Sequence, residues 1–296
     1  MHRHNLLLAL ALASGCSESR LPLQGGELPL PDEPPAAPAG ASGIYLADAD
    51  GGNARFLVTG ERPAWSPDGL RFAFQRNGQI YSAVADGSQE SRLGPGLDPS
   101  WSPDGRRLTF AGPEGIAVMG DDGGEVVTIL RYDVIGPVGN PAWSPDGSRI
   151  AFDRPGDGDV TPDQIFVMNA DGSEPRHVTV TRGVLYAESG PAWSPDGNEI
   201  LFWSYGYGIA AVASGGGTPR SLYQDFRTVA YGANPALAPH GGAVLFTVDR
   251  SQIMGSALWL LDGGGHTPRV IIENAMDGVW SPDGSKILFG RITGAH

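Results

Sequence analysis

Cysteine is almost absent from this sequence, and charge is scarce. Cys16 is the only cysteine among 296 residues, so an intramolecular disulfide framework is excluded and stability must come from packing. Charged residues make up 18% of the chain, with 33 acidic against 20 basic side chains. The net charge of −13 argues against nucleic-acid backbones and anionic membrane surfaces as partners.

Motifs for catalysis and metal binding are also missing. No G-x-S-x-G nucleophile elbow occurs. The histidines beyond the N-terminal segment fall in different parts of the chain without metal-ligand spacing: His177, His240, His266 and His296. We therefore expect no metal site, no cofactor and no catalysis.

Helical periodicity is hardly present, and a five-residue motif recurs instead. Trp-Ser-Pro-Asp-Gly occurs five times, and the degenerate copy Leu-Ala-Pro-His-Gly fills the one gap. The six copies are Trp65–Gly69, Trp101–Gly105, Trp143–Gly147, Trp193–Gly197, Leu237–Gly241 and Trp280–Gly284. Their first residues follow at intervals of 36, 42, 50, 44 and 43 residues, which indicates a repeat architecture.

Each repeat contains two predicted hairpins. In the first, a Pro-Asp-Gly turn leads into a short apolar run that ends in phenylalanine, such as Phe72–Phe74 or Ile150–Phe152. In the second, strands such as Ile44–Leu46 and Ile165–Val167 are followed by Asp-Gly, a strong hairpin signal. Four antiparallel strands per repeat of this length are typical of β-propeller blades.

The order of the hairpins predicts how the ring closes. The chain opens with the Asp-Gly hairpin at Ile44 and finishes with the motif strand pair at Phe289, so its two ends must share a blade. We predict an all-β fold: a six-bladed β-propeller of four-stranded antiparallel blades, closed by a composite blade from both chain ends.

These repeats resemble a known family. The motif followed by Ser148–Phe152, and then Gln164–Ser173, is similar to the WD40-like repeats of the TolB propeller family. The resemblance covers about residues 43–291, and therefore the propeller domain only. It implies the same six-bladed ring.

The first residues are expected to form a lipoprotein signal peptide, residues 1–15. A weakly basic start precedes the apolar run Leu6–Ala13, which is too short to span a bilayer. Leu12–Cys16 resembles the bacterial lipobox, so we expect cleavage before Cys16 and lipidation of its thiol. Residues 16–42 then form a proline-rich tether, and residues 43–296 form the propeller.

All long connections are predicted on one face of the ring. If the strands of a blade are called a to d from the axis outward, the a–b and c–d turns are short throughout. The longer connections are b–c and d–a stretches: Leu130–Asn140, Asp153–Gln164, Thr181–Gly190, Tyr223–Asn234 and Thr247–Ala257. Loops on a rigid scaffold are where binding concentrates.

Candidate binding residues follow from this sidedness. The residue just before each Pro-Ala/Ser pair, or its equivalent in the last repeat, starts an innermost strand at the channel mouth: Arg62, Asp98, Asn140, Gly190, Asn234 and Asp277. Further candidates are charged residues at the ends of the b strands and aromatic residues of the fourth repeat: Arg76, Asp153, Arg154, Arg250, Tyr186, Tyr205 and Tyr207. The channel-mouth groups could equally serve only to solvate the channel. The motif tryptophans are expected in the core, and the motif aspartates in turns.

The sequence favours a binding module over an enzyme. We expect a monomeric, lipid-anchored propeller of the cell envelope, on the periplasmic face of the outer membrane, that binds an envelope protein or peptide through its loop-rich face. It would contact the membrane only through the anchor and would not bind nucleic acid. An enzyme acting on carbohydrate or another small ligand through acidic residues in the channel remains the alternative, and a structural scaffold is a third.

Overall fold

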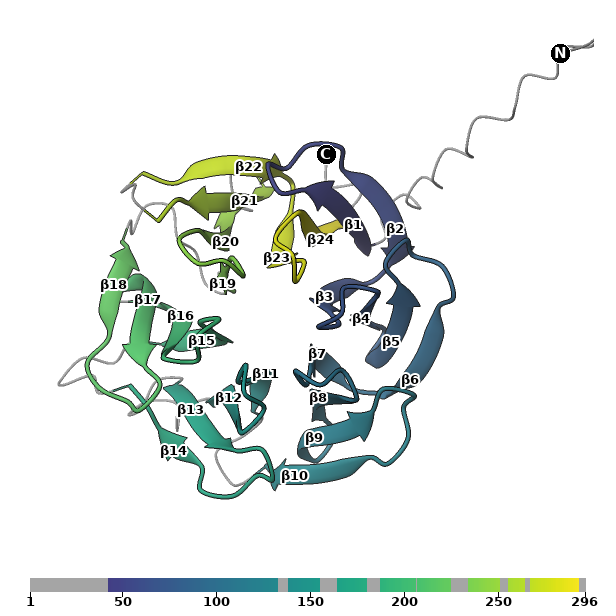
Figure 1. The fold of residues 1–296 in the computed structure, drawn as a ribbon, viewed down its shortest axis with the longest axis vertical. Helices are drawn as coiled ribbons and strands as arrows, with labels where there is room; N and C mark the ends of the chain where they lie inside the picture. Colours follow the sequence, from purple (N-terminus) through teal and green to yellow (C-terminus); the bar gives the residue numbers. More distant parts are fainter. Residues whose placement is uncertain are drawn as a thin grey trace, which may run out of the picture. The chain divides into compact units, whose positions relative to one another are not determined.

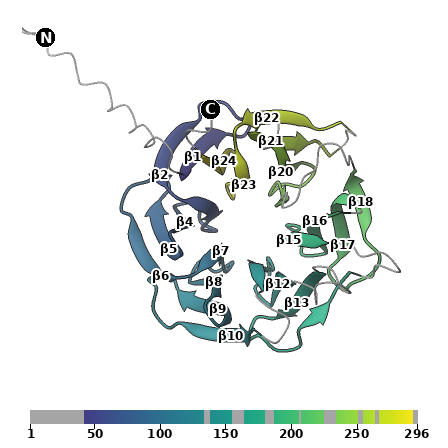
Figure 2. The same ribbon diagram turned by 180° about the vertical axis from the view of Figure 1, so that it is seen from behind.

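A computed structural model describes residues 42–132, 138–154, 164–179, 187–205, 207–224, 234–250, 255–263 and 267–292. Every regular element in these ranges is a β-strand. The strands form six four-stranded antiparallel sheets that stand around a central axis, as Figures 1 and 2 show from opposite sides. The predicted six-bladed propeller is confirmed. Within these ranges no helix is long and apolar enough to cross a membrane.

The first three blades follow the chain from the axis outward. Blade 1 comprises β3 (Glu61–Trp65), β4 (Arg71–Arg76), β5 (Gln79–Val84) and β6 (Ser91–Pro95). Blade 2 comprises β7 (Leu97–Trp101), β8 (Arg107–Gly112), β9 (Gly115–Gly120) and β10 (Val127–Arg131). Blade 3 comprises β11 (Gly139–Trp143), β12 (Arg149–Arg154), β13 (Gln164–Asn169) and β14 (Arg176–His177).

The last three blades include the closure. Blade 4 comprises β15 (Glu188–Trp193), β16 (Glu199–Ser204), β17 (Gly208–Ala213) and β18 (Arg220–Tyr223). Blade 5 comprises β19 (Ala236–Leu237), β20 (Val244–Arg250), β21 (Gly255–Leu261) and β22 (Arg269–Glu273). Blade 6 comprises β23 (Met276–Trp280) and β24 (Lys286–Ile292) with β1 (Ser42–Asp48) and β2 (Arg55–Thr59).

Blade 6 joins the two chain ends, as predicted. Strand β1 pairs with β24 in antiparallel register, with Tyr45 opposite Phe289 and Leu46 opposite Leu288. The aromatic rings of Tyr45 and Phe289 stack with their centroids 5.6 Å apart. Because no disulfide is available, this ladder and its packing hold the ring closed.

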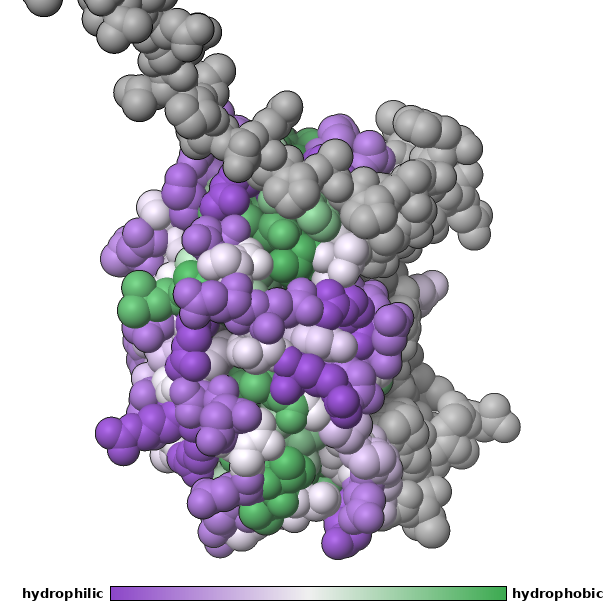
Figure 3. All heavy atoms as spheres, turned by 90° about the vertical axis from the view of Figure 1, so that its right-hand side faces the viewer, coloured by the Kyte–Doolittle hydropathy of each residue, from purple (hydrophilic) through white to green (hydrophobic). Residues whose placement is uncertain are grey.

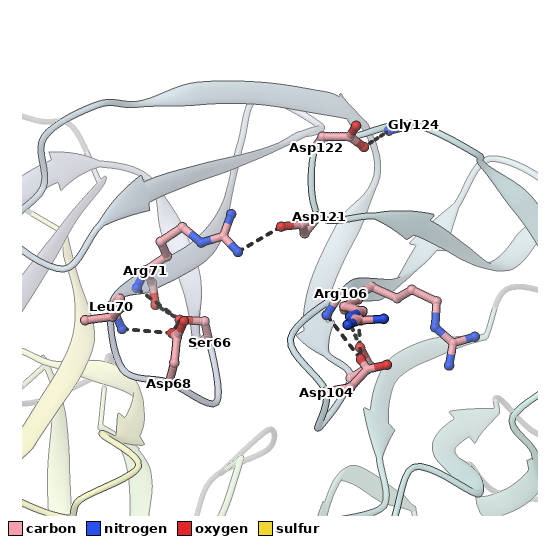
Figure 4. A network of polar contacts seen from close by, with 11 residues as sticks. Ser66, Asp68, Leu70, Arg71, Asp104, Arg106, Asp121, Asp122 and Gly124 are labelled. Atoms are coloured by element: carbon pink, nitrogen blue, oxygen red, sulfur yellow. Dashed lines mark hydrogen bonds and ion pairs between the residues drawn. The ribbon is translucent and has the colours of Figure 1, made fainter.

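The recurring turn explains the recurring motif. In blade 1 the Ser66 hydroxyl donates to the Asp68 carboxylate (2.6 Å), and Asp68 also accepts from the backbone N–H of Leu70 (3.0 Å). Gly69 takes a φ of 71°, which favours glycine. Figure 4 shows this turn beside its counterpart around Asp104 in blade 2. The motif aspartates are therefore turn formers, as predicted.

The core lies between blades rather than in one centre. The phenylalanine that ends each apolar run is at most 2% exposed: Phe74, Phe110, Phe152, Phe202, Phe246 and Phe289. The motif tryptophans pack there as well. Trp101, at 7% exposure, donates its indole N–H to the carbonyl of Ala64 in the preceding blade (3.1 Å).

Neighbouring blades also meet through arginine. Arginines at one motif position lie over the tryptophan of the next blade, at 4.8 to 5.0 Å from the ring centroid: Arg71 over Trp101, Arg107 over Trp143, and Arg149 over Trp193. Arg71 also pairs with Asp121 in the c–d turn of blade 2 (2.8 Å, Figure 4). The a–b and c–d turns therefore share one face, which we call the turn face.

One side of the outer wall is mainly polar. Figure 3 shows the side of the ring that carries β5 and β6, where hydrophilic residues dominate and hydrophobic residues gather in separate patches. The buried apolar side chains form clusters between neighbouring blades instead.

Candidate functional site

A polar ring surrounds the channel. We use this name for the six residues that precede the Pro-Ala/Ser pairs, or their equivalent in blade 6: Arg62, Asp98, Asn140, Gly190, Asn234 and Asp277. All six adopt left-handed backbone conformations, with φ between 24° and 64°. In five of the six innermost strands the pairing register shifts around this residue, as in a β-bulge. The bulge turns the ring side chain out of the ladder.

The ring separates two cavities. The larger, of about 820 Å³, is lined by b–c and d–a connections such as Gly78, Gly96 and Pro113, together with ring residues. We call this side of the propeller the loop face. The smaller cavity, of about 220 Å³, is lined by the ring and by the Pro-Ala and Pro-Ser pairs below it. The loop face therefore carries a pocket of ligand size, with the polar ring as its floor.

Arg62 reaches from blade 1 toward three other blades. Its guanidinium donates to Asn140 Oδ1 (3.0 Å). The same group lies 3.7 Å from an oxygen of Asp98 and 3.5 Å from an oxygen of Asp277. Burial by itself lowers the pKa of Arg62, but the carboxylates of Asp277 and Asp98 outweigh it, so the pKa is raised. Arg62 stays charged in the ring.

Asp153 fixes the opposite part of the ring. This residue lies in β12, and its Oδ2 accepts from the Asn140 amide (2.7 Å) and from the Gly190 backbone N–H (3.0 Å). A Cβ at Gly190 would lie 2.4 Å from Asn234 Oδ1, so a larger residue there would force the Asn234 side chain to shift. The Asn234 amide in turn donates to Asp277 Oδ1 (2.7 Å). The ring residues thus hold one another in place across blades.

Asp98 is a ring carboxyl in surroundings that disfavour its charged form. Burial raises its pKa, and the charge of Arg62 and the backbone N–H of Asn140 offset this only in part. Asp98 and Asp153 both approach Gly139. A Cβ placed on Gly139 would lie 3.9 Å from Asp98 Oδ2 and 3.0 Å from Asp153 Oδ1. Two carboxyl groups therefore lie close together at the cavity wall.

The structure adds one residue that the sequence did not single out. Glu188 begins β15 and is 1% exposed. Its Oε2 accepts from the Thr179 hydroxyl (2.6 Å) and lies 3.4 Å from the backbone N of Ile165. Burial raises its pKa to about 7, although these hydrogen bonds act in the opposite direction. Its neighbour Ser189 lines the large cavity.

The remaining predicted residues lie in several places. Arg154 lines the large cavity. Arg76 pairs with Glu90 and lies 4.0 Å from the centroid of the Tyr81 ring, outside the cavity lining. Tyr205 is 68% exposed, whereas Tyr207 packs against the core between blades 3 and 4. Tyr186, Cys16 and the side chain of Arg250 lie outside the described residues.

No metal centre emerges in the part of the chain that the structure describes. There, no three His, Cys, Asp or Glu side chains gather so that they could hold a metal ion. The described residues of the polar ring offer charge recognition and hydrogen bonding, with carboxyl groups as acids or bases.

Solved structures share this fold at low sequence identity. A candidate TolB from Agrobacterium tumefaciens superposes with a TM-score of 0.70 at 23% identity, covering 85% of this chain and 98% of that one. TolB from Acinetobacter baumannii superposes with a TM-score of 0.56 at 16% identity, covering 86% of this chain and 64% of that one. A gluconolactonase from Xanthomonas campestris gives 0.58 at 15%, covering 87% and 98%.

Sequence comparison points to the same family. No curated protein matches the chain in sequence. The TolB beta propeller domain family, in contrast, matches residues 95–295, more than half of the chain. This match agrees with the repeated motif and with the six-bladed ring. The chain belongs to the TolB beta propeller domain family.

Proposed function

We propose that this propeller is a binding module of the cell envelope that holds a protein or peptide on its loop face and performs no catalysis. The observation that carries the proposal is the cavity of about 820 Å³ whose floor is the polar ring. Five blades contribute a polar side chain to that floor, and interblade hydrogen bonds fix several of them before any ligand arrives. A preorganised pocket of this kind loses little entropy on binding.

The envelope location rests on the N-terminal segment. Leu12–Cys16 resembles a lipobox, and the proline-rich residues that follow suit a spacer between a lipid anchor and the propeller. We propose anchoring through lipidated Cys16 at the periplasmic face of the outer membrane, with a monomeric propeller. Mass spectrometry of the wild-type chain from membranes tests this, because an unlipidated Cys16 would contradict it.

Partner capture tests the binding surface. A soluble Cys16→Ala chain would be used as bait in envelope extract, alone and with Arg62→Gln, Asp98→Asn and Asp277→Asn together. The matched control carries Arg71→Gln and Asp121→Asn, an ion pair on the turn face. We expect the ring variant to lose the captured partner and the control to keep it, with nearly unchanged melting temperatures. Undiminished capture by the ring variant would exclude the polar ring as the site.

A carbohydrate-directed enzyme is the second candidate. It is favoured by the carboxyl groups of Asp98 and Asp153 at one cavity wall. Among the structures with a similar propeller is also an oligogalacturonate lyase, at 15% identity and a TM-score of 0.56, covering 88% of this chain and 95% of that one. Oligogalacturonate and gluconolactone are therefore the substrates to assay first. Turnover that disappears in Asp98→Asn and in Asp153→Asn would replace the binding-only proposal.

A further inference from the structure

The inward-facing groups of the polar ring are mainly hydrogen-bond acceptors. Asn140 Oδ1, an oxygen of Asp98 and an oxygen of Asp277 converge on the position of the Arg62 guanidinium. The amide N–H groups of the two asparagines point elsewhere, because that of Asn140 donates to Asp153 and that of Asn234 donates to Asp277. The centre of the ring is therefore built to accept hydrogen bonds from a cation.

Arg62 fills this centre imperfectly. Its distances of 3.7 and 3.5 Å to the two carboxylates exceed the usual 2.7–2.9 Å of charge-assisted hydrogen bonds. Its side chain is 35% exposed, whereas those of Asp98 and Asp277 are 20% and 14% exposed. The cation is thus the most accessible member of the group, and two carboxylates share a single guanidinium. Consistently, the pKa of Asp98 remains raised with Arg62 in place.

The geometry of the cavities gives a direction of approach. The large cavity opens on the loop face and ends at the ring, while the small cavity beyond it is lined by the Pro-Ala and Pro-Ser pairs. The small cavity holds only about 220 Å³, and a charged group loses hydration beside the apolar side chains of these pairs, so a charged group that enters from the loop face is expected to stop at the ring.

We infer that the polar ring is a receptor for a single cationic group, a guanidinium or ammonium, and that the Arg62 side chain occupies this receptor until a ligand displaces it. The inference rests on the proposed function, since it names the chemistry that a bound partner presents to the ring. The group can belong to an arginine or lysine side chain of a peptide or to a small free amine.

A pair of matched peptides tests the charge requirement. Blocked pentapeptides with a central arginine and with citrulline, which has the same shape without the charge, would be titrated by calorimetry into wild type and Arg62→Ala. We expect Arg62→Ala to bind the arginine peptide at least about tenfold more tightly than the citrulline peptide, as is typical of a buried charged hydrogen bond. The wild type should bind the arginine peptide more weakly than Arg62→Ala does, because its own side chain competes.

Further variants identify the receptor. Adding Asp98→Asn and Asp277→Asn to Arg62→Ala should remove the preference for arginine over citrulline. Agmatine, a free guanidinium compound, distinguishes a peptide side chain from a small free amine as the ligand. Agmatine binding as tight as that of the arginine peptide would indicate a small amine. Should Arg62→Ala fail to fold, Arg62→Gln retains most of the side-chain length, and the two peptides can be compared on wild type directly.

Two results would overturn the inference. Equal binding of the arginine and citrulline peptides to Arg62→Ala would show that charge is not recognised. Tighter binding of an aspartate peptide than of the arginine peptide to wild type would show that Arg62 itself is the receptor, for an anion. Either result leaves the proposed function standing as long as the ring variant loses the captured partner. Undiminished partner capture by the ring variant would instead exclude the polar ring as the site of both.

Discussion

On the turn face, Asp146 accepts hydrogen bonds from the Ser144 hydroxyl and from Ser148, and its pKa falls to about 2. On the loop face, burial raises the pKa of Glu188 to about 7. The first carboxylate is stabilised by folding, and the second is destabilised by it. We infer that the hydrogen-bonded turns of the turn face stabilise the folded propeller. The loop face, in contrast, lowers its stability because it buries an acidic group close to the cavity.

The variant with the largest expected effect on this comparison is Glu188→Gln. The folded-state pKa lies above the unfolded value of 4.5, so wild type loses stability as the pH rises from about 4.5 to 7 and keeps the full penalty above that. The shift corresponds to roughly 3 kcal/mol. We expect urea denaturation at pH 5 and pH 8 to show this loss in wild type and not in Glu188→Gln. Parallel pH profiles for the two proteins would remove the contrast between the faces.

The sequence predicted the elements that repeat. The Pro-Asp-Gly turn, the strand that ends in phenylalanine and the residue at the channel mouth occur at constant positions in the repeats, so one interpretation serves all blades. Glu188 has no such repetition, and its hydrogen-bond partners Thr179 and Ile165 lie outside the strands of its own blade. A sequence carries no signal for a contact of this kind unless the blade order and the register are already known.

The contacts within the ring could be predicted only in part. Position in the repeat placed Arg62, Asp98 and Asp277 at one channel mouth. Which of them pair is decided by side-chain reach across the channel, since Arg62 meets residues of blades 2, 3 and 6. That geometry follows from ring closure and from the left-handed backbone at each bulge.

A second test removes a buried hydroxyl group from one turn on the turn face. Ser144 donates to Asp146 (2.6 Å) and accepts from the Arg149 backbone N–H (2.9 Å), with its side chain almost fully buried. We expect Ser144→Ala to cost about 1–2 kcal/mol, because the Arg149 N–H loses a partner. The Ser148 hydroxyl donates to the same carboxylate from an exposed position, so Ser148→Ala should lower the free energy of unfolding by less. Equal losses in urea denaturation would show that the buried hydroxyl has no special role.

A third test repairs the degenerate copy of the motif. In blade 5 the backbone keeps the turn, with Gly241 N–H donating to the Ala238 carbonyl (2.8 Å), but the serine and aspartate are replaced by Ala238 and His240. Restoring both through Ala238→Ser and His240→Asp should raise the free energy of unfolding by about 1 kcal/mol. Each single change should give less, because the hydroxyl and the carboxylate need each other. Additive single effects would contradict this coupling.

The smallest effect is expected from an arginine between blades. The Arg107 guanidinium lies 5.0 Å from the centroid of the Trp143 ring, so Arg107→Ala should cost about 0.5–1 kcal/mol. Arg106→Ala, at the neighbouring exposed position, is the matched control and should change stability little. If the two faces are independent, neither variant alters partner capture or the affinity of the arginine peptide for the loop face. A weaker affinity in Arg107→Ala at unchanged fold would show that the packing between blades also sets the geometry of the polar ring.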